Sequence, residues 1–340
     1  MNWKTVLLKE AILYLLLPFS SFSCSGQKTF GTEYLQLVKT IEMPGVKGRI
    51  DHLAVNVKEN IIYLAASGNN SIEVVDIKKG LVLHSIEGLS EPQGVAYIPE
   101  TNELIVANGG DGKCIFYNAS DYAVITTLHL AGDADNIRYD STSGKIYIGY
   151  GRGGIAVIDA ANHKQAGNIE LPAHPESFQL DEKNHLLLVN LPEANSVAVI
   201  SLNKLNVLNT WKTKNLNANF PMALDTANNH VIIGFRHPAV LVTYDVKTGG
   251  EINRTNLVSD VDDVFYYAAG HQVLASGGGG SINIFTKYAD NTFKKFANIP
   301  SRSGTRTSLL IPALQAYVVA EPANGSMRAA LVAYKIDIKN

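Results

Sequence analysis

Cysteine is scarce in this sequence: only Cys24 and Cys114 occur among its 340 residues. Two cysteines cannot build a disulfide framework, and neither stands in a zinc-binding or haem-attachment spacing. Cys114 lies in a short strand-like run at residues 113–117, where we expect a buried, unreactive thiol. The sequence therefore excludes a disulfide-stapled fold, and its lack of a haem or copper ligand set argues against electron transfer.

An excess of charge of one sign is also missing. The chain has 29 Lys and Arg against 31 Asp and Glu, a formal net charge of −2, and the two signs are interspersed. Proteins that bind nucleic acid carry a basic stripe or patch that releases counterions from the phosphates. Because no such stripe occurs in the sequence, we expect no nucleic-acid partner.

Long amphipathic helical patterns are absent as well, and short apolar runs take their place. Hydrophobic residues make up 46% of the chain, with 28 glycines, which is typical of an all-β globular protein. Residues 133–171 show the basic unit, with runs at 136–139, 146–150, 155–158 and 167–171 separated by turn residues. Four short strands at this spacing predict one antiparallel sheet.

The unit recurs along the chain at steps of about 40 to 45 residues, the period of propeller blades. The start of its first strand can be placed at Asp51-His52, Gln93-Gly94, Asp135-Asn136, Glu176-Ser177, Pro221-Met222, Asp262-Asp263 and Arg306-Thr307. A single such sheet cannot bury both faces, whereas a ring of sheets packs each face on a neighbour. We therefore predict an all-β fold, a seven-bladed β-propeller of four-stranded antiparallel blades.

The propeller is expected to span residues 34–340 as one domain. The last blade, starting near Thr305, has room for only three strands before the chain ends. Residues 34–41 form a strand-compatible run before the first repeat start, so we expect this N-terminal strand to complete the last blade and close the ring.

The first 33 residues have a different character. An apolar run at residues 6–19, preceded by Lys4 and interrupted by Lys9, is short for a transmembrane helix and typical of a signal peptide. Small residues then lead to Cys24, which resembles the lipidated cysteine of a bacterial lipoprotein. We expect residues 1–23 to be a signal peptide, residues 24–33 a short linker, and a lipid on Cys24 the only membrane attachment.

Two alternatives stay open for this segment, an ordinary cleaved signal peptide and a retained anchor. All three readings place the domain outside the cytoplasm. We expect a location in the bacterial periplasm or cell envelope.

The repeat phrases resemble the YVTN-repeat, or YncE-like, family of seven-bladed propellers. The resemblance is carried by DHLAV (51–55), EPQGV (91–95), LIVANGGDG (104–112), DADNIRY (133–139), HPESFQL (174–180) and RTSL (306–309). It covers nearly all of the chain after the N-terminal segment. It implies a secreted or periplasmic propeller, but little about function, because related rings serve as lactonases, electron-transfer subunits and binding scaffolds.

The strand starts should form a polar ring at one mouth of the central channel. The candidate ligand-binding residues are Asp51, His52, Glu91, Gln93, Asp133, Asp135, Asn136, His174, Glu176, Asp262, Asp263 and Arg306. Carboxylates that converge raise one another's pKa unless arginine or a cation compensates. A divalent cation, calcium or magnesium, could therefore be held by Asp51, Glu91, Asp135, Glu176 and Asp262.

A structural interpretation competes with this one. Asp and Asn at strand starts often bond to turn backbone, and arginine–carboxylate pairs between blades would make the ring a part of the scaffold. The run of four glycines at residues 277–280 is expected to be a blade loop, because no helix or Gly-Lys-Ser/Thr follows it.

Two functions follow from the sequence. The first is an extracytoplasmic propeller that binds a small polar ligand or an envelope protein at the channel mouth without catalysis. The alternative is a metal-dependent hydrolase of lactones or related esters, in which a bound cation activates water. The second requires carboxylate oxygens to converge at about 2.0 to 2.6 Å from one point. No residue is assigned a catalytic role.

Overall fold

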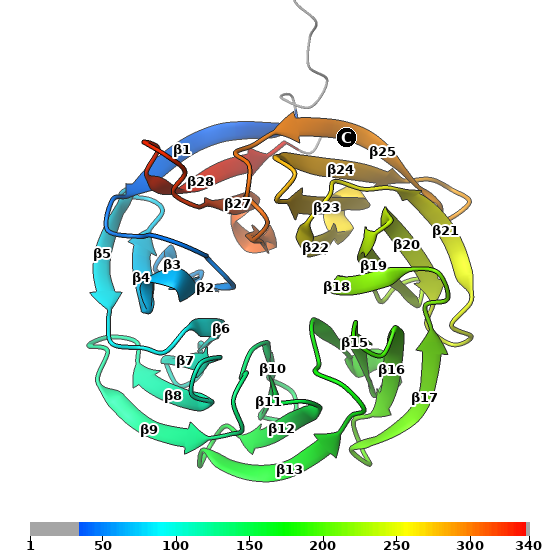
Figure 1. Ribbon diagram of the computed structural model, residues 1–340, viewed down its shortest axis with the longest axis horizontal. Coiled ribbons are helices and arrows are strands. Elements are labelled where there is room, and N and C mark those ends of the chain that lie inside the picture. Colours follow the sequence, from blue (N-terminus) through cyan, green and yellow to red (C-terminus); the bar gives the residue numbers. More distant parts are fainter. Residues whose placement is uncertain (1–33, 338–340) are drawn as a thin grey trace, which may run out of the picture.

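The computed structural model describes residues 34–337 and shows a closed ring of seven four-stranded antiparallel sheets (Figure 1). This confirms the predicted fold class and blade number. No α-helix occurs among the described residues, which contain only strands and four short 3₁₀ turns, at Ser67–Asn69, Glu182–Asn184, Ala268–Gly270 and Pro312–Leu314. No helix in this part of the chain has the length and apolar character to cross a membrane.

Blades 1 to 4 follow one another along the chain, and each runs from an innermost to an outermost strand. Blade 1 consists of β2 (Leu53–Asn56), β3 (Ile61–Ala66), β4 (Ser71–Asp76) and β5 (Leu81–Ile86). Blade 2 consists of β6 (Pro92–Ile98), β7 (Glu103–Asn108), β8 (Lys113–Asn118) and β9 (Val124–His129). Blade 3 consists of β10 (Ile137–Asp140), β11 (Lys145–Tyr150), β12 (Gly154–Asp159) and β13 (Lys164–Glu170). Blade 4 consists of β14 (Phe178–Asp181), β15 (Leu186–Leu191), β16 (Ser196–Ser201) and β17 (Asn206–Lys212).

Blades 5 and 6 repeat the pattern, and blade 7 departs from it. Blade 5 consists of β18 (Asn217–Asp225), β19 (His230–His237), β20 (Ala239–Asp245) and β21 (Glu251–Asn256). Blade 6 consists of β22 (Val261–Tyr267), β23 (Gln272–Gly277), β24 (Ser281–Lys287) and β25 (Phe293–Pro300). Blade 7 takes β26 (Ser308–Ile311), β27 (Ala316–Glu321) and β28 (Ala329–Ile336) from the C-terminal stretch and β1 (Leu35–Met43) from the N-terminal one.

Ring closure rests on the pairing of β1 with β28. The two strands run antiparallel from Leu35 opposite Ile336 to Met43 opposite Ala329, with one irregularity between Leu37 and Lys39. Ile41 and Met43 are buried in the core between blades 7 and 1. The predicted closing strand is therefore confirmed, and it joins the two ends of the described chain in one sheet.

Turns between third and fourth strands explain why many repeats carry an aspartate at the same place. The Asp76 carboxylate accepts the Lys79 N–H at 2.7 Å, and Asp245 accepts the Lys247 and Thr248 N–H groups at 3.1 and 2.8 Å. Ser201 substitutes for aspartate in blade 4 and accepts the Lys204 N–H at 3.2 Å. The recurring residue satisfies turn donors, as expected for Asp and Ser at such positions.

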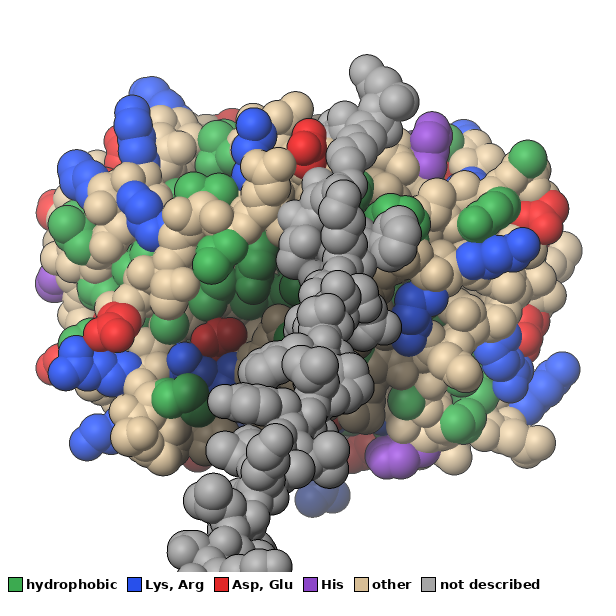
Figure 2. Space-filling model, turned by 90° about the horizontal axis from the view of Figure 1, so that it is seen from above, with side chains coloured by type: hydrophobic (Ala, Val, Ile, Leu, Met, Phe, Trp, Pro, Cys, Tyr) green, Lys and Arg blue, Asp and Glu red, His purple; other side chains and the backbone are tan. Residues whose placement is uncertain are grey.

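Hydrophobic clusters lie between neighbouring blades and fill the ring. Tyr317 of blade 7, for example, packs with Leu274 and Ile282 of blade 6. Cys114 is fully buried, and burial raises the pKa of its thiol to about 12, as expected for an unreactive cysteine. On the side of the ring shown in Figure 2, basic and acidic side chains are interspersed. The predicted signal peptide, Cys24 and the linker at 24–33 lie outside the described residues.

Candidate functional site

The predicted strand starts are β-bulges. In blade 1, the Asp51 N–H donates to the Ala65 carbonyl at 2.8 Å, and the Ala65 N–H donates to the His52 carbonyl at 3.0 Å. Two residues thus oppose one, which defines a bulge and redirects the side chains of that strand. Asp135-Asn136 oppose Gly149, and Glu176-Ser177 oppose Asn190, in the same way.

Glycine at the bulge of blade 2 brings the next blade close. A Cβ on Gly94 would lie 1.9 Å from the Asp135 carbonyl oxygen, so no other residue fits there without a shift of the backbone. This close approach sets the position of Asp135, one of the predicted site residues, at the channel.

The bulges surround a polar cavity, called here the mouth cavity, of about 190 Å³. Every blade contributes to its wall, and all lining side chains except one are polar or charged. The lining residues are Arg49, Gln93, Asp133, Asp135, His174, Glu176, Phe220, Arg236, Asp262 and Arg306. A site assembled from seven blades requires the whole ring.

The twelve predicted ligand-binding residues fall into four groups. Seven line the mouth cavity: Gln93, Asp133, Asp135, His174, Glu176, Asp262 and Arg306. His52 and Asp263 line a deeper cavity of about 280 Å³, called here the inner chamber. Asp51 and Asn136 are buried and line neither cavity, while Glu91 is exposed and also lines neither.

Arginines that line the mouth cavity neutralise carboxylates in its wall and beside it. Arg49 pairs with Asp51 at 2.7 Å, and Arg306 pairs with Asp260 at 2.9 Å. Arg236 forms a close ion pair with Asp262 and a longer one, 3.4 Å, with Asp260. The structural interpretation of the ring thus accounts for these carboxylates.

Glu176 is different, because it forms no ion pair among the described residues. Burial, together with the charges of Asp135 and Asp262, raises the pKa of its carboxyl to about 8. The group is therefore largely protonated at neutral pH and can donate a hydrogen bond into the mouth cavity. A scaffold role leaves this side chain unexplained, whereas a binding role uses it.

His52 lies at the boundary between the two cavities. Its Nε2 is 3.4 Å from Asp135 Oδ1 and 3.9 Å from Asp51 Oδ1. Burial disfavours a charged imidazole, but the Asp135 carboxylate outweighs it and raises the pKa of His52 to about 10. The same contact holds the pKa of Asp135 below its ordinary value despite burial. The pair is therefore ionic at neutral pH.

The five proposed metal ligands do not converge. Among residues 34–337, no group of three or more His, Cys, Asp or Glu side chains is placed to hold a metal ion. Asp51 and Asp262 face arginines instead, and Glu91 is exposed. Calcium or magnesium binding stays a prediction, without a ligand cluster in the described chain to support it.

Three mouth residues lie outside the twelve candidate ligand-binding residues: Arg49, Phe220 and Arg236. The Arg236 guanidinium lies 4.0 Å from the centre of the Phe220 ring and donates to the Val261 carbonyl at 2.9 Å. Arg236 comes from the end of β19, so its position depends on the loop between second and third strands. The positive charge of Arg236 near this loop was the sequence feature that could have identified it.

Comparisons with known proteins place the fold and leave the family open. No family model matches the sequence, and no curated protein matches it. A solved structure described as "Crystal Structure of Mitotic Checkpoint Complex" contains a chain of similar fold. The TM-score is 0.76, the identity is 15%, and the match covers 97% of this chain and 99% of that chain. At this identity the likeness shows the propeller fold alone.

Proposed function

We propose that this protein is a non-catalytic binding propeller whose mouth binds a partner protein. The observation that carries the proposal is the mouth cavity, where all seven blades contribute side chains and nine of the ten lining residues are polar or charged. Polar groups gathered at one end of a propeller channel provide donors and acceptors to an inserted side chain or loop.

A protein partner is favoured over a free small ligand by a second hollow beside the mouth. This hollow measures about 800 Å³, shares Asp133 and His174 with the mouth cavity, and is bounded by Arg152 and Glu193 from loops of blades 3 and 4. Together the two concavities suit a loop that lies across blades 3 and 4 and inserts its tip into the mouth. The similar chain in the mitotic checkpoint structure is itself part of a protein complex, by its description.

The location is part of the same proposal. We infer an envelope protein of the YncE-like kind, anchored by lipid on Cys24, from the sequence of the N-terminal segment and the repeat phrases. Cys24→Ala should then release the protein from membrane fractions into the soluble envelope fraction, as followed by immunoblotting of fractionated cells. Retention of Cys24→Ala in the membrane would contradict the lipid anchor.

The partner can be sought with a photo-crosslinking amino acid placed at either end of β12. Arg152 precedes this strand in the exposed loop at the mouth side, and Asn162 follows it in an exposed turn at the opposite end of the blade. We expect one protein to crosslink from position 152 and not from position 162. Equal crosslinking from both positions would contradict binding at the mouth.

Affinity of the purified partner then tests the residues. Arg49→Gln should weaken binding at least tenfold, because this half-exposed guanidinium lines the mouth. Arg254→Gln, on the outermost strand β21, is the matched control and should leave affinity unchanged. If a small polar molecule rather than a protein is bound with the same dependence on Arg49, the other form of the sequence-based hypothesis is correct.

The hydrolase alternative is tested on the same protein. Lactone hydrolysis that depends on added calcium or magnesium, and is lost in Asp135→Asn, would replace the binding proposal. Glu176→Gln distinguishes the hydrolase from the binding propeller. A site that activates water needs the carboxylate and should lose activity, whereas a hydrogen-bonding site keeps a donor in the amide and should still bind.

A further inference from the structure

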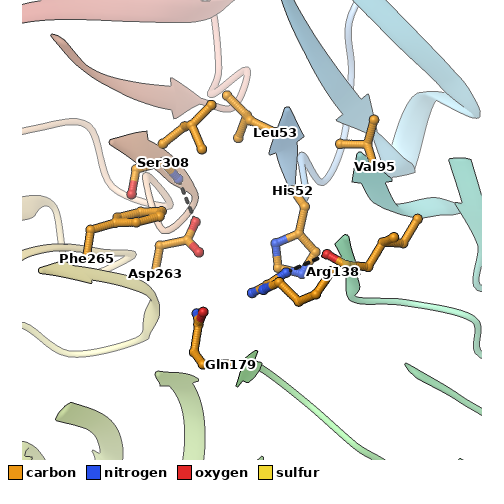
Figure 3. Close-up of a pocket in the computed structure, with 10 residues that line it drawn as sticks. His52, Leu53, Val95, Arg138, Gln179, Asp263, Phe265 and Ser308 are labelled. Carbon is orange, nitrogen blue, oxygen red and sulfur yellow. Dashed lines mark hydrogen bonds between the residues drawn. The ribbon is translucent and has the colours of Figure 1, made fainter. Parts of the chain in front are cut away.

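The inner chamber is a second cavity, with its own polar groups, that the proposed partner binding does not use. It shares no lining residue with the mouth cavity. Figure 3 shows Arg138 and Asp263 entering it from opposite sides, with Gln179 from a third blade. These side chains retain partial contact with water, so the chamber is accessible to solvent.

Arg138 supplies most of the free hydrogen-bond donors in this chamber. Its Nη1 donates to the Ile137 carbonyl at 2.8 Å, and its guanidinium lies 5.5 Å from the centre of the Phe178 ring. No ion pair of Arg138 occurs among residues 34–337. A guanidinium has five N–H donors, so several remain for a ligand. In a partly desolvated site, a carboxylate is the group that fits this fork best.

Asp263 supplies the opposite charge across the chamber. Its Oδ2 accepts the Ser308 N–H at 2.7 Å, and its other oxygen has no hydrogen bond among the described residues. Burial raises the pKa of Asp263 to about 6, so the carboxylate is mostly ionised at neutral pH. A cationic or hydrogen-bond-donating group on the ligand would complete it.

Apolar side chains form the remaining wall. Leu53, Val95 and Leu309 line the chamber beside the two charged groups. The volume, about 280 Å³, lies at the low end for small-molecule sites and leaves room for a compact molecule only. His52, whose imidazole is protonated at neutral pH, also lines the chamber, and its charge acts on Asp263. The chamber therefore presents two cationic side chains, Arg138 and His52, one carboxylate, Asp263, and an apolar patch within one small space.

We propose that the inner chamber binds a small zwitterion, an α-amino acid with an apolar side chain. Its carboxylate pairs with Arg138, its ammonium group with Asp263, and its side chain packs on Leu53, Val95 and Leu309. A simple carboxylate would leave the second oxygen of Asp263 without a donor, and an amine would leave the remaining N–H groups of Arg138 without an acceptor, so a molecule with both groups fits the chamber best.

The test is calorimetric titration of the full chain with three related molecules. L-leucine has both charged groups, L-leucinamide lacks the carboxylate, and 4-methylpentanoate lacks the ammonium group. We expect L-leucine to bind and each of the other two to bind at least tenfold more weakly, a loss of about 1.4 kcal/mol or more.

Variants assign the two charged groups. Arg138→Gln should weaken L-leucine binding at least tenfold, and Arg138→Lys should fall between it and the natural chain, because lysine keeps the charge without the fork. Asp263→Asn should remove the preference for L-leucine over 4-methylpentanoate. Arg254→Gln, on the outer wall, is the control for loss of one positive charge.

Three results would overturn the proposal. One is failure of the folded natural chain to bind L-leucine, L-alanine or L-phenylalanine at millimolar concentration. Another is unchanged L-leucine affinity in Arg138→Gln or, should that variant not fold, in Arg138→Lys. The third is equal binding of L-leucine and 4-methylpentanoate, which would indicate a plain carboxylate site. None of these results bears on partner binding at the mouth, which depends on other residues.

Discussion

Aspartates stand at both ends of the innermost strands, and their surroundings differ. At the strand ends, Asp140 accepts the Thr142 N–H at 2.9 Å, and Asp225 accepts two hydrogen bonds from the Asn228 side chain and pairs with Lys287 at 2.6 Å. At the strand starts, carboxylates face arginines, one another and the channel. The pKa of Asp225 lies below its ordinary value, whereas burial raises the pKa of Asp262 to about 6.

The direction of the pKa shift distinguishes carboxylates that stabilise the scaffold from carboxylates of the candidate site. A carboxylate whose pKa is lowered gains stability from its charge in the folded protein, and one whose pKa is raised loses stability by it. Glu176 and Asp262 therefore cost the fold free energy that Asp225 does not. Groups that a protein keeps at such a cost are candidates for function, which is the basis for assigning binding to the mouth.

The largest loss of stability should come from replacing an aspartate at the end of an innermost strand. Asp225→Ala leaves Lys287 buried without its partner between blades 5 and 6, so the free energy of unfolding should fall by about 3 to 5 kcal/mol in urea titrations. Adding Lys287→Met should recover much of the loss. Asp262→Asn at the mouth should change the free energy of unfolding by less than about 1 kcal/mol, because Arg236 retains its ion pair with Asp260. Equal losses in Asp225→Ala and Asp262→Asn would remove the distinction.

Replacing Glu176, a carboxyl of the mouth cavity, should increase stability instead of lowering it, and the increase should depend on pH. Because the pKa of Glu176 is about 8 in the folded protein, the natural chain should lose stability relative to Glu176→Gln as pH rises from about 4.5 through 8. At pH 9 the variant should be more stable by about 2 kcal/mol, less than the full shift implies because water reaches the side chain. Parallel melting curves of both proteins from pH 4 to 9 would contradict this.

The His52–Asp135 contact should stabilise the fold in a different pH range. The pKa of His52 is raised to about 10, so its contribution is complete below about 6.5 and is lost as pH rises through 10. His52→Gln should cost about 1.5 kcal/mol at pH 6 and little above pH 10. Denaturant titrations at both values measure the difference, and a cost independent of pH would indicate packing instead of charge.

A smaller loss than in Asp225→Ala should come from a single aspartate in a turn between third and fourth strands. Asp245→Ala removes the acceptor of the Lys247 and Thr248 N–H groups, which water can replace in this partly exposed turn, so a loss of about 1 kcal/mol is expected. Asp245→Asn keeps an acceptor oxygen and should lose less. If the two variants melt at the same temperature, the side-chain oxygen is not what holds the turn.

The blades could be predicted from sequence because their turns are local. Asp76, Asp159 and Asp245 lie in equivalent turns and accept hydrogen bonds from the backbone N–H groups there. Short recurring sequence segments therefore reveal the repeat period of the blades. The closing strand followed from the three strands left for blade 7. Turn residues and strand spacing depend only on residues close in sequence, so they can be recognised without knowledge of tertiary contacts.

The site could be predicted only in outline, because a bulge changes which way each side chain points. Asp262 and Asp263 are adjacent in sequence, yet the register shift between Val261 and Asp263 sends one to the mouth cavity and the other to the inner chamber. Arg138 was missed because it follows the predicted strand start by two residues. The exposed position of Glu91 depends on a left-handed backbone, φ 48°, that local composition does not specify.

The pairing of β1 with β28 has a consequence for when the protein can act. The mouth cavity draws on residues from Arg49 to Arg306, and the strand that locks the final blade comes from the opposite end of the described chain. A chain emerging during synthesis can build its early blades, but it cannot present the finished cavity until the last strand meets the first. Recognition at the mouth would thus report that the entire ring is complete, so that a partner distinguishes finished molecules from fragments.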